Sequence, residues 1–143
     1  MPNTVDPAVS LLIIDDNPGS LDLLSSALAQ PGLEIFTASD PEDGLDIACS
    51  RHPQIVLTDL VMPNLSGLDV LDRIMEVDPA TDVILMTAHY SSESAVEAIK
   101  KGASDYLNKP VSIGLLRERI GKLVGEARKR HRSLQLEDEL RAN

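Results

Sequence analysis

Apolar residues fall into short continuous runs, and between these runs they recur every three or four positions. A continuous run of about four to eight apolar residues is typical of a strand buried on both faces of a parallel sheet, whereas the wider spacing indicates an amphipathic helix. Buried strands are therefore predicted at 10–16, 55–59 and 82–88. A half-buried strand is predicted at 33–38, and a short edge strand at 103–109.

Turn-forming and capping residues separate these strands from the helices. A turn is predicted at 17–20, ahead of the first helix. Ser39 or Asp40 can accept the free N–H groups at the start of the second helix, and Ser91 or Ser92 can do so for the fourth. Strands and helices thus alternate along the chain with short loops between them.

This alternation predicts an α/β fold, a doubly wound five-stranded parallel sheet of the (βα)5 type with right-handed crossovers. The expected strand order is 2-1-3-4-5, the flavodoxin-like arrangement, so strands 1 and 3 lie side by side where the strand order reverses. Ligands of open α/β sheets bind at the carboxyl ends of the strands beside this point.

The last helix is predicted to run from about 113 to 141, a length of roughly 40 Å. This exceeds the expected width of the sheet, so the helix must project. We divide the chain into a globular domain at 8–128 and a helical linker at 129–143 that continues the last helix. Apolar residues on the projecting part, such as Leu134 and Leu140, need a partner. A coiled-coil dimer is the natural hypothesis, although their spacing is not a regular heptad.

The composition fits one soluble globular domain, with 43% apolar residues in a chain of 143. No apolar run approaches the length of a membrane span, and residues 1–6 lack the features of a signal peptide. A cytoplasmic protein with no membrane contact is therefore expected. Cys49 is the single cysteine, which excludes an internal disulfide, and it is predicted to be a buried, unreactive thiol.

Charge is distributed unevenly. Residues 1–99 contain 17 acidic and 2 basic residues, a net charge of −15, whereas residues 100–143 contain 6 acidic and 11 basic residues, a net charge of +5. The acidic body would repel DNA, so no direct nucleic-acid binding is expected. The basic run at 128–132 is interpreted as a solvated helix face.

Three carboxylates follow the two strands that are predicted to be neighbours. Asp15 and Asp16 end the first strand, and Asp59 ends the third. Converging carboxylates repel one another, and their oxygen atoms in an open site suit Mg²⁺. The alternative is that these are exposed acids along a loop edge. Convergence at the point where the strand order reverses favours the metal site.

Two further groups are expected at the same edge of the sheet. Lys109 follows the fifth strand and can bring a positive charge to an anion near Asp59, and Thr87 ends the fourth strand and can donate a hydroxyl hydrogen bond. A carboxylate nucleophile, Mg²⁺, an ammonium and a hydroxyl donor are the groups needed for in-line phosphoryl transfer to Asp59.

With these residues in place, the chain resembles a response-regulator receiver domain of two-component signalling over residues 8–128, and most of all the NtrC-like subgroup. The motif residues that carry this resemblance are Asp15-Asp16, Asp59 within Asp-Leu-Val-Met-Pro-Asn-Leu-Ser-Gly, Thr87-Ala88, Tyr106 and Lys109-Pro110.

The resemblance implies a phosphorylation site at Asp59, which would accept a phosphoryl group from the phosphohistidine of a sensor histidine kinase. It implies that Asp16, Asp59 and the carbonyl of Val61 bind Mg²⁺, and that Asp15 helps mainly through water. It also implies that Lys109 contacts the phosphoryl group. Such a protein is a signalling module that catalyses only its own phosphorylation and dephosphorylation.

The resemblance also implies a cis bond before Pro110 and a conformational switch. Thr87 would turn toward phosphorylated Asp59 and pull Ala88 with it, and Tyr106 would move from a solvent-facing to a buried rotamer. The altered surface would comprise the helix after residue 91, the strand at 103–109 and the last helix.

That surface, or the projecting helix, would form a homodimer. In the NtrC-like subgroup such a linker leads to an AAA+ domain that activates transcription. No phosphate-binding loop of an ATPase is found in this chain.

Two other functions remain open at this stage. One is a stand-alone phosphorelay receiver. The other is a Mg²⁺-dependent phosphohydrolase with Asp59 as a transient nucleophile, which usually needs an acid two residues later, where this chain has Val61. Because apolar Val61 cannot orient a hydrolytic water, slow self-dephosphorylation is predicted. His89 is interpreted as an exposed loop residue.

Overall fold

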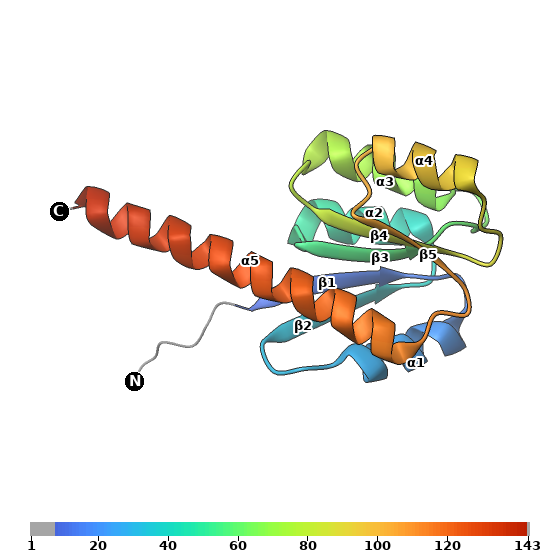
Figure 1. The fold of residues 1–143 in the computed structure, drawn as a ribbon, viewed down its shortest axis with the longest axis horizontal. Helices are drawn as coiled ribbons and strands as arrows, with labels where there is room; N and C mark the ends of the chain where they lie inside the picture. Colours follow the sequence, from blue (N-terminus) through green and yellow to red (C-terminus); the bar gives the residue numbers. More distant parts are fainter. Residues whose placement is uncertain (1–7, 143) are drawn as a thin grey trace.

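The computed structural model describes residues 8–142, and the core of this part is a five-stranded parallel sheet (Figure 1). The strand order is β2-β1-β3-β4-β5, so the predicted fold class and order are confirmed. The strands are β1 (Val9–Ile14), β2 (Leu33–Ala38), β3 (Ile55–Asp59), β4 (Asp82–Thr87) and β5 (Asp105–Asn108).

Helices cover both faces of the sheet. Within residues 8–142 they are α1 (Pro18–Leu28), α2 (Pro41–Arg51), α3 (Gly67–Val77), α4 (Ser92–Lys100) and α5 (Ile113–Ala142). Helices α1 and α5 lie on one face, and α2, α3 and α4 lie on the other (Figure 1). Successive side chains of a strand point to opposite faces. Leu12 and Ile14 of β1 therefore pack under α2 and α3, whereas Leu11 and Ile13 pack under α1 and α5.

The helix starts follow the capping chemistry of the sequence, with one correction. The turn predicted before the first helix is in fact its cap and first turn: the Asn17 side chain accepts the N–H of Ser20, and the helix begins at Pro18. A proline fits this position because it lacks the N–H group that would be unpaired there. Asp40 and Ser91 cap α2 and α4, as the sequence predicts.

Gly67 allows the start of α3 to lie against the end of β3. Its backbone N–H donates to the carbonyl of Leu60 at 2.7 Å. A Cβ atom at this position would lie 2.5 Å from the carbonyl oxygen of Asp59 and 2.9 Å from the Cα of Leu60. Both neighbours are backbone atoms, which cannot rotate away, so the close approach requires glycine.

We expect the Gly67→Ala variant to lose roughly 1–3 kcal/mol of unfolding free energy, because the new methyl group forces the backbone of β3 and α3 apart. Urea denaturation monitored by circular dichroism measures this loss. Gly121→Ala is the matched control. It lies within α5 with open space around it, and alanine there should stabilise the helix by up to about 1 kcal/mol. Equal stability of Gly67→Ala and wild type would contradict the close approach.

Helix α5 is one continuous element of 30 residues, and its first part is tied to the body of the domain. The Arg117 side chain donates to the carbonyl of Ala27 at 2.7 Å, and the Arg128 side chain donates to the carbonyl of Pro31 at 3.1 Å. These contacts join α5 to the end of α1 and the loop before β2.

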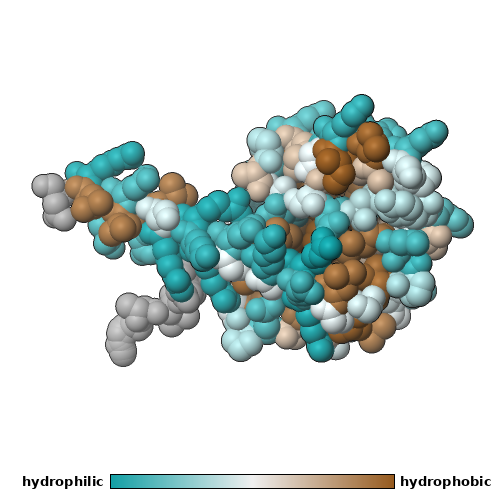
Figure 2. Space-filling model, in the orientation of Figure 1, coloured by the Kyte–Doolittle hydropathy of each residue, from teal (hydrophilic) through white to brown (hydrophobic). Residues whose placement is uncertain are grey.

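The described residues after 128 are exposed, and the far end of the helix projects from the body, as the sequence predicts, whereas Arg130 still pairs with Asp82 of β4 at 3.6 Å (Figure 1). Leu134, Leu136 and Leu140 are among the exposed large apolar residues, and Figure 2 shows apolar side chains gathered on the projecting end of the helix. The helix at 129–142 therefore lies outside the hydrophobic core.

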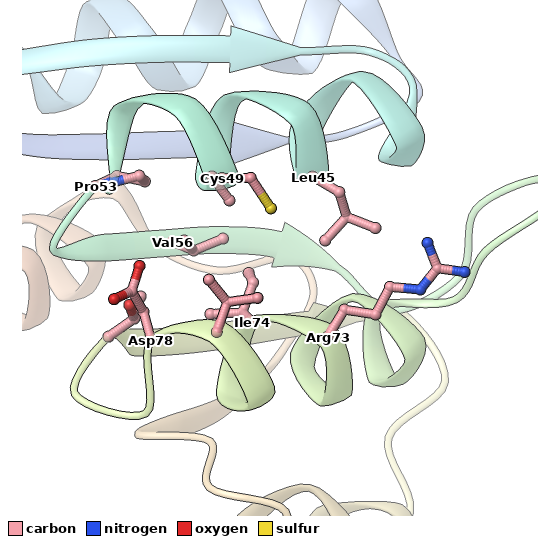
Figure 3. A pocket seen from close by; sticks show the side chains of 10 residues that line it. Leu45, Cys49, Pro53, Val56, Arg73, Ile74 and Asp78 are labelled. Carbon is pink, nitrogen blue, oxygen red and sulfur yellow. The ribbon is translucent and has the colours of Figure 1, made fainter.

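Cys49 is exposed, which contradicts the prediction of a buried thiol. It lies on α2 beside a small pocket between α2 and α3, together with Leu45 and Ile74 (Figure 3). The volume of this pocket is about 10 Å³, enough for a single water molecule at most. This pocket is therefore too small to be a ligand site.

The helices described here are too short or too polar to serve as membrane spans. The sequence interpretation of residues 1–6 concerns a segment outside the described residues.

Candidate functional site

The three predicted carboxylates meet at the carboxyl edge of the sheet. Asp15 and Asp16 follow β1, and Asp59 is the last residue of β3. The two strands are paired, with Ile14 opposite Thr58. One oxygen atom of each carboxylate lies within 4.8 Å of the others. Residues more than forty positions apart in the chain are thus brought into one cluster by the pairing of β1 with β3.

The carboxylates differ in their surroundings. Asp15 is 1% exposed, and its Oδ1 accepts the backbone N–H of Asn17 at 3.0 Å. Its Oδ2 is buried and has no hydrogen-bond partner among the described residues. Asp16 is exposed, and Asp59 is partly buried. The cluster is open to solvent on the side of Asp16.

Lys109 provides the positive charge of the site. Its Nζ lies 3.1 Å from Oδ2 of Asp59 and 3.6 Å from Oδ2 of Asp15. Its backbone N–H donates to the carbonyl of Thr87 at 2.7 Å, which fixes the end of β5 against the end of β4. The Lys109–Pro110 peptide bond is cis.

One ammonium does not balance three carboxylates. The remaining negative charge, the Oδ2 of Asp15, which has no hydrogen-bond partner among the described residues, and the accessible side at Asp16 fit a hard divalent cation with oxygen ligands. Asp15, Asp16 and Asp59 are the residues that could hold it. Within the described part of the chain, no other group of three or more His, Cys, Asp or Glu side chains brings its ligand atoms within 4.8 Å of one another.

Thr87 lies at the end of β4, next to this cluster in the sheet. It is fully buried, and its Oγ1 accepts the backbone N–H of His89 at 2.9 Å. The hydroxyl hydrogen remains available for donation to another acceptor. Ala88 and His89 are exposed, in line with the interpretation of His89 as a loop residue.

Tyr106 occupies an inward position, with 8% exposure, and packs in the core cluster beneath α3 and α4. The sequence-based hypothesis begins with a solvent-facing Tyr106. In the structure Tyr106 instead has the buried rotamer that was expected only after phosphorylation. The phenol oxygen of Tyr106 is buried, and no hydrogen-bond partner is found for it within residues 8–142. The ring of Tyr90 lies against it, with the ring centroids 5.2 Å apart.

Sequence reasoning missed Tyr90. The residue lies in a loop with no hydrophobic period of its own. A signal was nevertheless available, since the chain has only two tyrosines, one phenylalanine and no tryptophan. An aromatic residue three positions after Thr87 is therefore unusual for this composition.

Val61 is 59% exposed and follows Leu60, whose backbone N–H donates to the carbonyl of Met86 at 2.7 Å. The backbone of this loop is thus attached to β4 immediately before Val61. The Val61 side chain presents no hydrogen-bonding group at the rim of the site.

A pocket of about 390 Å³ opens beside the cluster, between α1 and the start of α5. Asp15 and Lys109 contribute to its lining, together with Leu23, Pro110 and Ile113. Leu23 is 62% exposed. The approach to the acidic cluster from this side is therefore apolar at its rim and charged at its base.

Comparison with known proteins places this geometry in a family. The sequence model described as the response regulator receiver domain matches residues 11–121. The response regulator protein PilR of Pseudomonas aeruginosa is 36% identical over 109 residues, which are 76% of this chain and 24% of PilR. The chain spans less than half the length of the curated relatives it matches. The predicted resemblance to receivers of NtrC-like activators is confirmed.

Solved structures of receiver domains have the same fold as this chain. The response regulator receiver domain protein from Clostridium thermocellum has a TM-score of 0.77 and 35% identity, with 83% of this chain and 96% of that chain covered. The CheX–CheY–BeF3–Mg²⁺ complex from Borrelia burgdorferi has a TM-score of 0.76 and 26% identity, with 82% and 90% covered. The chain therefore belongs to the response regulator receiver domain family.

Proposed function

We propose that the chain is a phosphorylation-activated receiver in which Asp59 accepts a phosphoryl group from a sensor histidine kinase in the cytoplasm. The observation that carries this proposal is the position of Asp59. Its carboxylate lies 3.1 Å from the Lys109 ammonium and within 4.8 Å of the carboxylates of Asp15 and Asp16. Asp59 is also partly exposed, so a donor can reach it.

In the proposed reaction, an Asp59 carboxylate oxygen attacks the phosphorus of a phosphohistidine. The new O–P bond forms as the P–N bond breaks, and the imidazole leaves with the electron pair. Receiver domains bind Mg²⁺, and when bound in the carboxylate cluster it would neutralise phosphoryl charge. We assign the metal-binding role to Asp16, Asp59 and the carbonyl of Val61, with Asp15 acting through water.

Lys109 would bind a phosphoryl oxygen in the same reaction. In the structure it contacts both Asp59 and Asp15, so it can follow the charge as it moves from the carboxylate to the phosphoryl group. Positioning and charge neutralisation account for most of the catalysis of such transfers.

We propose that Thr87 and Tyr106 read the phosphorylation state. The Thr87 hydroxyl has a free hydrogen to donate to a phosphoryl oxygen, and its turn would draw Ala88 toward the site. Tyr106 would be held inward in the activated population. Phosphorylation then shifts the equilibrium between two conformations of α4 and β5.

The surfaces support two kinds of partner. The apolar rim around Leu23, above the charged base of the neighbouring pocket, suits a helix of the phosphodonor protein. Exposed Val96 and Ile99 on α4, together with the leucines of the projecting helix, suit a second copy of the chain. We propose a homodimer through α4, β5 and α5, or through the helical linker at 129–143. In a longer protein, that linker would lead to a domain that regulates transcription.

The test is incubation of the protein with acetyl phosphate and Mg²⁺, followed by intact-mass and size analysis. We expect one phosphoryl group per chain, which hydroxylamine removes, and none when EDTA sequesters the metal. A change in oligomeric state would support the dimer. Turnover of acetyl phosphate without a stable adduct would favour the phosphohydrolase alternative. Phosphorylation without a size change would keep the receiver function and move the output to a partner or a further domain.

Val61 is expected to slow the loss of the phosphoryl group, because an apolar side chain cannot orient the attacking water. Val61→Asn should shorten the half-life of the phosphorylated protein by about tenfold or more. The half-life is measured by intact mass after removal of acetyl phosphate. Val77→Asn, which changes another exposed valine at the end of α3, is the control and should have no effect. A wild-type half-life of seconds, unchanged in Val61→Asn, would contradict this role.

A further inference from the structure

Two of the three aromatic side chains in the sequence pack against each other at the proposed switch. Tyr90 and Tyr106 have ring centroids 5.2 Å apart and an angle of 60° between the ring planes. This distance and tilt fall in the range in which aromatic pairs attract each other beyond simple burial. The pair therefore provides a specific contact between the β4–α4 loop and β5.

Tyr90 occupies a position between two fixed points of that loop. On one side, the hydroxyl oxygen of Thr87 accepts the N–H of His89 at 2.9 Å. On the other side, Ser91 caps α4 by accepting the N–H of Ser94 at 3.1 Å. A turn of the Thr87 hydroxyl would remove the acceptor of the His89 N–H. The loop conformation at Tyr90 is thus coupled to the position of Thr87.

Tyr106 needs a contact of this kind in order to stay inward. It is 8% exposed, and its phenol oxygen is buried with no hydrogen-bond partner in the described part of the chain. Burying an unpaired hydroxyl costs free energy, so the inward rotamer depends on favourable packing elsewhere on the ring. Ala98 and Ala103 are buried in the same hydrophobic cluster as Tyr106. The Tyr90 ring, which is 49% exposed, covers Tyr106 from the solvent side.

We propose that Tyr90 is a positioning residue of the switch, whose ring holds Tyr106 in the inward rotamer and links this rotamer to the loop that follows Thr87. The role of Tyr90 in signalling rests on the proposed function, phosphorylation of Asp59. The contact between the two rings, however, can be tested without any phosphodonor. Failure of one hypothesis can therefore be distinguished from failure of the other.

The chain offers a direct probe, because it contains only two tyrosines and no tryptophan. Incorporation of 3-fluorotyrosine should give two ¹⁹F NMR signals. Tyr90→Phe keeps the ring and leaves Tyr106 as the single reporter, and Tyr90→Ala removes the ring and leaves the same reporter. The H₂O/D₂O isotope shift of the ¹⁹F signal measures how exposed Tyr106 is to solvent.

In Tyr90→Phe we expect the Tyr106 signal to keep the small isotope shift of a buried ring. In Tyr90→Ala we expect the Tyr106 signal to divide or broaden between inward and outward positions, corresponding to a decrease of about 2- to 10-fold in the ratio of inward to outward rotamers. A single inward Tyr106 signal in a folded Tyr90→Ala protein, changed only by the larger isotope shift that loss of the covering ring produces, would overturn the proposal. Tyr106→Phe gives a second test in which Tyr90 is the only reporter. Its signal should retain the shift caused by the neighbouring ring.

The link to phosphorylation is tested with beryllofluoride, which mimics the phosphoryl group when Mg²⁺ is present. The Tyr106 signal of Tyr90→Phe should sharpen or move toward a single inward position, whereas Tyr90→Ala should reach that position only in part. Equal responses in the two variants would contradict the coupling. Intact-mass analysis after acetyl phosphate treatment shows separately whether Asp59 is modified. A wild-type protein that is not modified would count against the proposed function and not against the ring contact.

Discussion

Asp59→Asn is expected to reduce phosphorylation by acetyl phosphate to background. Asparagine has nearly the shape of aspartate but is neutral and a poor nucleophile, so the new O–P bond cannot form at this position. The variant also removes one of the three carboxylates that cluster within 4.8 Å. Mg²⁺ should therefore raise the melting temperature of the variant less than that of wild type. Intact mass measures the first effect, and thermal denaturation with and without Mg²⁺ measures the second.

Asp46→Asn is the matched control, because it removes one negative charge from the exposed face of α2, away from the site. It should be phosphorylated like wild type and respond to Mg²⁺ in the same way. A phosphoryl group that still appears on Asp59→Asn would show that a different residue is the acceptor. Asp16, which is exposed in the same cluster, would then be the first residue to examine.

Lys109→Ala is expected to slow phosphorylation by about 100-fold, the usual effect of removing one group that stabilises developing charge. The ammonium lies 3.1 Å from the Asp59 carboxylate and 3.6 Å from that of Asp15. Its removal leaves the carboxylates without a cation. Mg²⁺ should therefore bind more tightly to the variant, since the repulsion between the ammonium and the metal is lost. A Mg²⁺ titration and the rate of adduct formation measure these opposite effects.

Two controls separate charge from general damage. Lys101→Ala removes an ammonium that pairs with Asp72 at 3.1 Å, away from the acidic cluster, and should leave both quantities unchanged. Lys109→Arg keeps the charge with a different shape and should fall between wild type and Lys109→Ala. If Lys109→Ala weakened Mg²⁺ binding as well as phosphorylation, the variant would have disturbed the geometry of the cluster, and the charge argument would fail.

The fold and the convergence of the site could be predicted from the sequence because both depend on strands. Each buried strand appears as a continuous apolar run, and a parallel sheet brings all carboxyl ends to one edge. Asp15 follows such a run directly, Asp59 ends another after Thr58, and Lys109 follows the predicted edge strand, so locating the strands was enough to bring the three residues together.

The features that the sequence did not predict, the exposure of Cys49 and the Tyr90–Tyr106 contact, depend on the direction in which a side chain points. Cys49 follows the buried Ala48 by one position on α2, and one residue on a helix is a rotation of about 100°, enough to turn the thiol to solvent. The inward rotamer of Tyr106 and its contact with Tyr90 depend on packing between β5 and a loop. No periodic pattern in the sequence reports such a contact.

Because α5 is continuous from Ile113 to Ala142, its length fixes the direction in which the distal side chains point around the helix axis. Each residue inserted after Arg128 would rotate everything beyond it by about 100° and advance it by about 1.5 Å. An insertion of about eleven residues, close to three full turns, would nearly restore the original azimuth, whereas an insertion of about five would point the distal leucines toward the opposite side. A signal transmitted through this helix therefore depends on the rotation of the distal residues about the helix axis as well as on their distance from the domain.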